Sequence, residues 1–159
     1  ITVTNNEDGG FGSLRNAVDN ICSHGRIDFD NDYTITLSNE ILLNKDLTID
    51  GLGYVIQIQS NGTDRIFSIP PGVTVSLDHL TIANGNKVNA DGGGILINQG
   101  NLTVTNSTLL NNTAVRGGAI FNDGGAVTIT NSTFSGNTAN SGGGGINNLA
   151  GTMSIINVH

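Results

Sequence analysis

Residues 102–114 read LTVTNSTLLNNTA, and residues 127–139 read VTITNSTFSGNTA. The two segments align without a gap, and apolar residues extend the alignment in both directions. One column contains Leu47, Val73, Leu102, Val127 and Met153. A second contains Ile49, Val75, Val104, Ile129 and Ile155. A third contains Ile41, Phe67, Leu96, Phe121 and Asn147, and the segments GGGI (92–95), GGAI (117–120) and GGGI (143–146) supply a fourth. The columns predict a repeat of about 25–29 residues.

Each repeat contains short runs in which β-branched or aliphatic residues alternate with Thr, as in residues 102–105 and 127–130. Such alternation predicts strands with one buried face, and the Gly, Asn and Asp residues between the runs predict tight turns. A unit of this length cannot bury its apolar face alone. Stacking the units so that equivalent strands pair in parallel buries the columns, which predicts an all-β parallel β-helix, or solenoid.

The composition agrees with such a stack. The chain has 159 residues, of which 23 are Gly, 23 Asn and 17 Thr, while aromatic residues make up only 4%. The net charge of −7 argues against nucleic-acid binding, and no apolar run approaches the roughly 20 residues that cross a membrane. All of that charge lies in residues 1–91, so the later repeats are neutral. The single Cys22 is interpreted as a small buried hydrophobic residue.

Asparagine recurs at fixed positions of the repeat. Asn106, Asn131 and Asn157 share one column, and Asn112 and Asn137 share another. Asparagine side chains in register can hydrogen-bond along a stack, and Asn tolerates the left-handed backbone of tight turns. We therefore assign these residues, together with the apolar column of Val104, Ile129 and Ile155, to structural ladders.

The N-terminal part of the chain differs from the repeats. Residues 1–4 predict a short strand, and Ser13 predicts the N-cap of a helix near residues 13–22 with Leu14, Val18 and Ile21 on one face. His24 and Gly25 are expected to end this helix, with Gly25 as a left-handed cap. A solenoid needs a cap on its first coil. We therefore divide the chain into a cap, residues 1–40, and coils, residues 41–159.

The last coil, residues 151–159, starts and stops inside one repeat. Its unpaired strand predicts either a longer native chain or end-to-end association with a second copy.

The segments VTNNEDGGFGSLRNAV (3–18), LTIDGLG (47–53) and LTVTNSTLLNNTAVRGGAIFN (102–122) resemble secreted bacterial proteins of the pectin-lyase-like β-helix superfamily. The F/L-x-x-N segments at 109–112 and 134–137 and GGAI at 117–120 are similar to the polymorphic outer-membrane protein repeats of surface adhesins. The resemblance implies a right-handed helix with three parallel faces per coil. It also implies export to the bacterial cell surface, where the partners would be a host or neighbouring cell or a glycan.

Enzymes of that superfamily act on acidic polysaccharides, and hydrolases need paired carboxylates about 5–9.5 Å apart. In our alignment Asp50 stacks on Ser76 and Asp78 on Leu52, so no two acids share a column. The best remaining pair, Asp46 and Asp50, is expected on a solvated face. We therefore assign no catalytic, cofactor or metal residues.

Calcium at acidic turns is the only cofactor considered, at Glu7 and Asp8 or at Asp28, Asp30 and Asp32. Asp91 and Arg116 occupy equivalent turns and are expected to form an ion pair between coils.

Two functions from different classes follow. The first is a non-enzymatic structural or adhesive module, extracellular or on the cell surface, which could assemble end to end. The alternative is a carbohydrate-active, lyase-like or glycan-binding β-helix. A third interpretation, ice binding, comes from the TxT pairs at 103/105 and 128/130, although strand positions favour Thr in any case.

Overall fold

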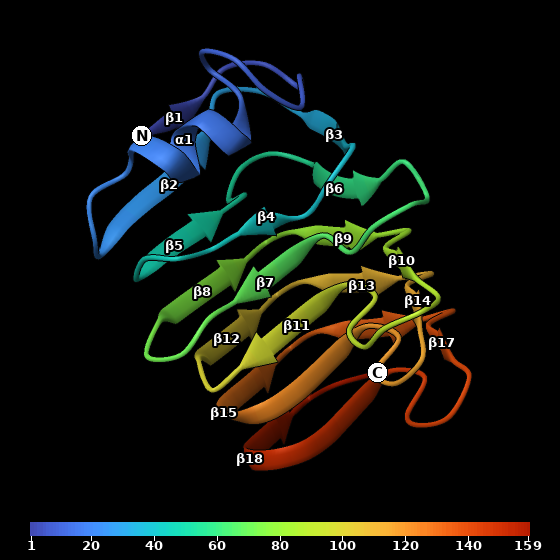
Figure 1. The fold of residues 1–159 in the computed structure, drawn as a ribbon. Coiled ribbons are helices and arrows are strands. Elements are labelled where there is room, and N and C mark those ends of the chain that lie inside the picture. The colour runs from blue at the N-terminus through green and yellow to red at the C-terminus, as the bar shows by residue number, and fades with distance from the viewer.

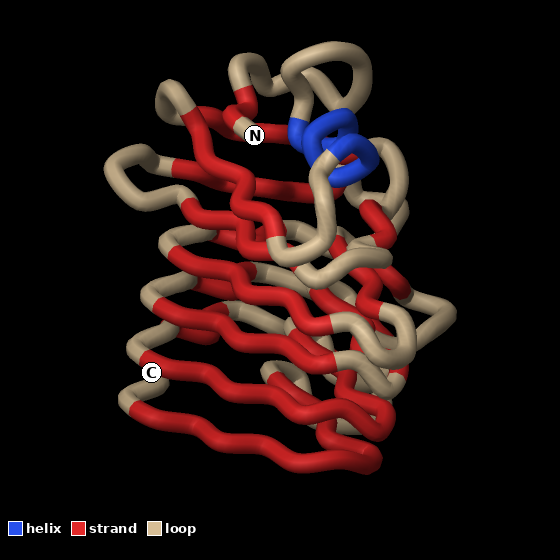
Figure 2. Tube along the Cα trace, turned by 90° about the vertical axis from the view of Figure 1, so that its left-hand side faces the viewer, coloured by secondary structure: helices blue, strands red, loops and turns tan.

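The computed structural model describes residues 1–159 and is a β-solenoid of about six turns, with 48% of its residues in strands and 4% in one short helix. Figure 1 shows the strands stacked along one axis, and Figure 2 shows the helix at one end of the stack. All strand pairs are parallel. The predicted all-β parallel solenoid is therefore confirmed.

The strands form three faces and a small fourth sheet at one corner. The first face consists of β1 (Thr2–Val3), β2 (Gly25–Phe29), β5 (Leu47–Asp50), β8 (Thr74–Asp78), β12 (Asn101–Thr105), β15 (Ile120–Thr130) and β18 (Ile146–Ile156). The second consists of β4 (Ile41–Leu42), β7 (Phe67–Ile69), β11 (Ile95–Asn98) and the first halves of β15 and β18. The third consists of β3 (Tyr33–Leu37), β6 (Ile56–Ser60), β9 (Thr81–Ala83), β13 (Thr108–Leu110) and β16 (Thr133–Ser135). The corner sheet consists of β10 (Asn86–Lys87), β14 (Thr113–Ala114) and β17 (Thr138–Ala139).

The helix α1 (Leu14–Asn20) caps the first turn. The Ser13 hydroxyl accepts a hydrogen bond from the Asn16 backbone N–H at 3.1 Å, which confirms the predicted N-cap. Leu14 and Val18 are buried in the helix, and Ile21 is buried directly after it. All three belong to the same hydrophobic core as the coils, so the helix covers the apolar end of the stack.

The predicted end of this helix is wrong. It ends at Asn20, with Ile21 in an extended conformation as its C-cap. The left-handed residue is His24, at φ 64°, and Gly25 is the first residue of β2, where it pairs with Leu47. A Cβ on Gly25 would collide with the Ile21 side chain, so this glycine allows close packing and does not reverse the backbone.

The predicted columns need correction in the early turns. Leu47 pairs with Val75, and Ile49 pairs with Leu77, so our alignment of Leu47 with Val73 is wrong by two residues. Val73 precedes β8, in the turn that follows Pro70. A slip of two residues keeps the same side chains inside, which is why the alternation of the sequence could not detect it.

The third column also divides. Phe67 pairs with Ile41 and Ile95, whereas Leu96 pairs with Ser68 and Phe121. The predicted column therefore combined residues from two adjacent columns of the sheet, which are offset by one residue. The glycine segments are aligned as predicted, because Ile95, Ile120 and Ile146 stack in register.

The glycine corners let successive turns approach closely. The backbone N–H groups of Gly93 and Gly94 donate to the carbonyls of Gly117 and Gly118 in the next turn, at 3.2 and 3.0 Å. A Cβ on Gly93 would overlap the carbonyl oxygens of Thr113 and Gly118. Parallel pairing therefore continues through the corner only if no side chain is present there.

Candidate functional site

A group of charged side chains lies on the outer surface of the first face, where β5 and β8 end. Asp50 pairs with Asp78 on the next turn, so two carboxylates stack directly on each other. Our prediction that no two acids share a column is therefore wrong, and its cause is the two-residue slip in register. We call the residues Arg26, Asp28, Asp50, Asp78 and His79 the acidic cluster.

Asp50 is the centre of the acidic cluster and is only 5% exposed. Its Oδ2 lies 2.6 Å from the Arg26 guanidinium, and its Oδ1 accepts a hydrogen bond from the Leu52 backbone N–H at 2.7 Å. The expectation that Asp50 faces solvent is therefore wrong. Burial of a carboxylate is costly unless it is paired, and Arg26 supplies the compensating charge.

His79 follows β8 and has a left-handed backbone, with φ 52°. Its Nδ1 lies 2.9 Å from Asp78 Oδ1 and 3.5 Å from Asp50 Oδ1. That nitrogen is buried and has no hydrogen-bond partner. Asp78 Oδ1 also accepts a hydrogen bond from the Asn106 amide at 3.0 Å, which orients this carboxylate.

Asp28 belongs to the same column. It follows Ile27, which pairs with Ile49 on the next turn, and Ile49 is followed by Asp50. The Oδ1 atom of Asp28 is also buried without a partner. Asp28 is half-buried, whereas we expected it to face water with Asp30 and Asp32.

The other predicted acid, Asp46, lies apart from the acidic cluster. It borders a shallow groove on the same face, lined by His24, Asp46, Leu47, Thr48, Thr74 and Ser76. Asp46 Oδ1 accepts a hydrogen bond from the Thr74 backbone N–H at 2.7 Å, and Oδ2 lies 3.3 Å from His24 Nε2. Asp46 and Asp50 therefore have different partners and do not act as a pair.

The acidic turns considered for calcium are engaged in local contacts. Asp8 binds Arg15 at 2.7 Å and the Ser38 backbone N–H at 3.1 Å. Burial alone would raise the pKa of Asp8, but these hydrogen bonds outweigh it and hold the pKa below its ordinary value. Asp32 accepts a hydrogen bond from the Val55 N–H at 2.8 Å.

In the same segment, Asp30 accepts a hydrogen bond from the Tyr33 hydroxyl at 2.7 Å. This bond raises the pKa of Tyr33 to about 12, because it favours the protonated phenol.

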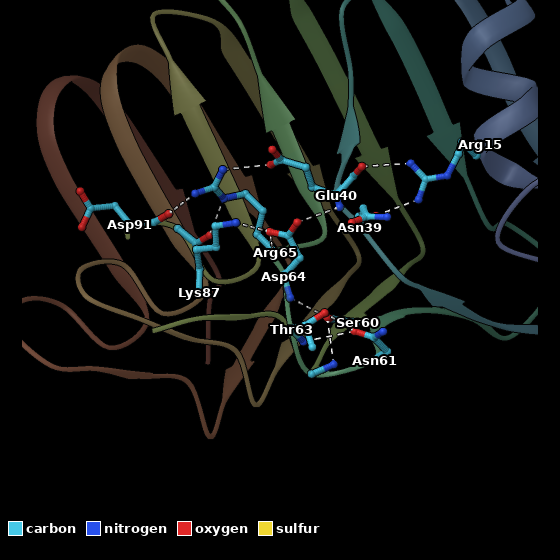
Figure 3. A network of polar contacts seen from close by, with 12 residues as sticks. Arg15, Asn39, Glu40, Ser60, Asn61, Thr63, Asp64, Arg65, Lys87 and Asp91 are labelled. Atoms are coloured by element: carbon cyan, nitrogen blue, oxygen red, sulfur yellow. Dashed lines mark hydrogen bonds and ion pairs between the residues drawn. The ribbon is translucent and has the colours of Figure 1, made fainter. Parts of the chain in front are cut away.

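A second charged feature follows one corner of the stack, and Figure 3 shows its central part. Five residues with charges of alternating sign recur at steps of 25 or 26 residues along the chain: Arg15, Glu40, Arg65, Asp91 and Arg116. We call them the charge ladder. Arg65 donates to Glu40 Oε2 at 2.9 Å and to the Asp91 carbonyl at 3.0 Å. Arg116 donates to both oxygens of Asp91, at 3.0 and 2.6 Å, so the predicted ion pair is confirmed.

A branch of this network adds Asp64 and Lys87, which are 2.5 Å apart. Burial would raise the pKa of Asp64, but hydrogen bonds from Lys87 and from two backbone N–H groups lower it. In the main network, by contrast, the hydrogen bond from Arg116 to Asp91 raises the pKa of Arg116. The alternating column could have been found in the sequence, but we aligned only its last two members.

The predicted ladder residues lie in register. Val104, Ile129 and Ile155 stack on three successive turns. Asn106, Asn131 and Asn157 all have a left-handed backbone, and Asn157 donates to Asn131 at 3.1 Å. Asn106 instead donates to Asp78, so it belongs to the acidic cluster as well. In the neighbouring column, Asn112 donates to Asn137 at 3.0 Å.

Cys22 is exposed, so its interpretation as a buried hydrophobic residue is wrong. It lies between the helix and β2, where the chain leaves the core. No helix is both long enough and apolar enough to span a membrane.

No protein-family model, curated protein or solved structure matches this chain. Its chemistry is therefore argued from the geometry above.

The geometry limits what the acidic cluster can do. A general acid or base must reach a proton of its substrate, but Asp50 is almost fully buried and Arg26 occupies one of its oxygens. The stacked carboxylates are therefore poorly placed to attack a sugar from solvent. The cluster instead offers oxygen and imidazole donors to a small ion. The groove beside it offers hydroxyl groups and one carboxylate to a polar ligand.

Proposed function

We propose that this chain is a non-enzymatic structural or adhesive β-solenoid module that acts outside the cell or on its surface. The observation that carries the proposal is the regular parallel stack, in which equivalent strands pair in register from turn to turn and Val104, Ile129 and Ile155 form one column. Stacked repeats of this kind give extended surfaces that suit contact with other molecules.

A second copy of the chain is one proposed partner, which would give end-to-end assembly. Each turn already presents its neighbour with a matching row of aliphatic side chains and backbone groups, as β15 does for β18. In such an assembly the column of Val104, Ile129 and Ile155 would be covered by the next copy. Burial of these side chains supplies the driving force.

Sedimentation velocity over a range of concentrations tests this proposal. We expect the average mass to rise with concentration for the wild type and to remain that of a monomer for Ile155→Lys, which places a charge in the apolar edge. Ser154→Lys adds the same charge one residue away, on the outward side of the same strand, and should still assemble. A wild-type chain that stays monomeric throughout, or equal assembly of the two variants, would refute the proposed contact.

Membership of the pectin-lyase-like superfamily and a role in adhesion also remain part of the proposal. Their support is the position of the repeated segments. The F/L-x-x-N segments end β13 and β16 and enter the following turns, and GGAI forms the corner before β15. A regular outer surface made of such turns suits contact with another surface. Binding of the fluorescently labelled chain to cells or to a glycan panel tests this role, and no binding to either would contradict it.

The groove favours one alternative, a glycan-binding or lyase-like function. Thr48 and Ser76 stack on adjacent turns within the groove, and Asp46 and His24 lie at its border. Hydroxyl, carboxylate and imidazole groups on a rigid β-sheet can form hydrogen bonds with sugar hydroxyl groups. Incubation with polyuronates, with detection of unsaturated products, tests lyase activity, and a glycan panel tests binding. Loss of a glycan signal in Ser76→Val, with retention in Thr128→Val outside the groove, would support this alternative.

A further inference from the structure

We propose that Asp50, Asp78 and His79 form a binding site for a divalent transition-metal ion of the zinc type. One donor atom from each residue lies within 4.8 Å of the other two. For a tetrahedral ion with ligand distances near 2.1 Å, ligand atoms are about 3.4 Å apart. His79 Nδ1 lies 3.5 Å from Asp50 Oδ1 and 2.9 Å from Asp78 Oδ1, so a small side-chain rotation would admit the ion.

An unpartnered atom gives further support. Only three buried side-chain polar atoms in the structure lack a hydrogen-bond partner, and one of them, His79 Nδ1, is a donor of this site. Buried polar atoms are nearly always satisfied, so an orphaned atom indicates a missing partner. His79 Nδ1 lies 2.9 Å from Asp78 Oδ1 without making a hydrogen bond to it, so this nitrogen can bind an ion in the tautomer that carries the proton on Nε2.

The charge balance also suits a divalent cation. Three carboxylates, those of Asp28, Asp50 and Asp78, occupy one column of the first face, whereas a single guanidinium, that of Arg26, pairs with Asp50. Arg26 contacts Oδ2 of Asp50, whereas the oxygen beside His79 is Oδ1. The guanidinium and the ion would therefore use different oxygens of the same carboxylate.

Surrounding groups hold the donors in place, as is usual around metal ligands. The Leu52 backbone N–H fixes Asp50 Oδ1, and the Asn106 amide fixes Asp78 Oδ1. Each oxygen keeps a lone pair for the ion. One imidazole and two carboxylates suit zinc and similar ions, with water completing the coordination, whereas Ca²⁺ takes six to eight oxygen ligands.

Equilibrium dialysis with Zn²⁺ at neutral pH tests the site. His79→Asn removes the imidazole and keeps a residue type that tolerates a left-handed backbone. His24→Asn is the matched control, because His24 is also left-handed and lies beside a carboxylate, Asp46, but not beside two. We expect one ion per wild-type chain at this site, at least tenfold weaker binding in His79→Asn and Asp78→Asn, and unchanged binding in His24→Asn. Exposed Cys22 is present in all four proteins.

Co²⁺ provides a second readout, because its visible absorption reports coordination directly. We expect the absorption of the wild type to be lost in His79→Asn, while the circular dichroism spectrum shows that the variant is folded. Three results would overturn the site: no Zn²⁺ bound by the wild type, equal binding by His79→Asn, or Ca²⁺ bound more tightly than Zn²⁺.

Discussion

Arg65 is the member of the charge ladder whose loss should cost the most stability. Its side chain is 9% exposed. Methionine has a similar volume and no charge, so it is the substitution of choice. Arg65→Met removes hydrogen bonds to Glu40 Oε2 and to the carbonyls of Asp91 and Gly92. The two carbonyls and one carboxylate then lie at a corner without their donor.

The expected loss follows from these three groups. Breaking a buried ion pair costs about 3–5 kcal/mol, but Glu40 is 33% exposed and can regain part of its hydration. We therefore expect the free energy of unfolding to fall by about 2–4 kcal/mol. For a chain of this size, a loss of about 3 kcal/mol lowers Tm by about 6–12 °C.

Urea and thermal denaturation followed by circular dichroism measure this loss. Arg116→Met is the matched control, because it also breaks an ion pair of the ladder, but Arg116 is 36% exposed. Its loss should be much smaller than that of Arg65→Met. The double variant Arg65→Met/Glu40→Gln should recover part of the stability, since no buried charge is left unpaired. Equal losses in the two single arginine variants, or no recovery in the double variant, would refute this reasoning.

Three further predictions concern the ladder, the corners and the pH dependence. Asn112→Ala should destabilise the fold by about 2–4 kcal/mol in urea denaturation, because the buried amide makes three side-chain hydrogen bonds, whereas Asn101→Ala on the surface should cost less. Similar losses in both variants would contradict a structural role for this ladder. Gly93→Ala should lower Tm strongly or prevent folding, because its Cβ would meet backbone carbonyls, while Gly9→Ala, with open space around it, should leave Tm nearly unchanged. A wild-type Tm for Gly93→Ala would show that the corner can widen. The lowered pKa of Asp64 means that its ionised form stabilises the fold above its ordinary value of 3.8, and that this contribution disappears as the pH falls through the lowered pKa. The Tm of Asp64→Asn should therefore fall less than that of the wild type between about pH 4 and 2. Parallel curves of Tm against pH for the two proteins would contradict the lowered pKa.

The register between strands of adjacent turns could be predicted from the sequence in the late turns but not in the early ones. The late turns are nearly constant in length, and there the pairing of Leu102 with Val127 was predicted correctly. The early turns carry insertions, and Val73 and Val75 suit the same inward position equally well. Strand periodicity is two residues, so the sequence does not distinguish these alignments. The turn after Pro70 decides between them by delaying the start of β8 to Thr74.

The candidate site was missed for the same reason. The true step from Asp50 to Asp78 is longer by two residues than the step of our alignment, which placed Ser76 on Asp50 and so assigned the two acids to different columns. The charge ladder, by contrast, keeps a nearly constant step throughout, and a search for alternating charges at the repeat interval would have found it.

The sequence alone therefore determined the architecture, because a recurring apolar pattern with turn residues between short strands can bury its surface only by stacking. It also determined where the helix covers the stack and which asparagines and glycines recur at the turns. Tertiary structure decided which side chains meet across adjacent turns, since that depends on the length of each turn. The burial of Asp50, the orphaned nitrogen of His79 and the exposure of Cys22 are all consequences of those turn lengths and of the chain's path around the stack.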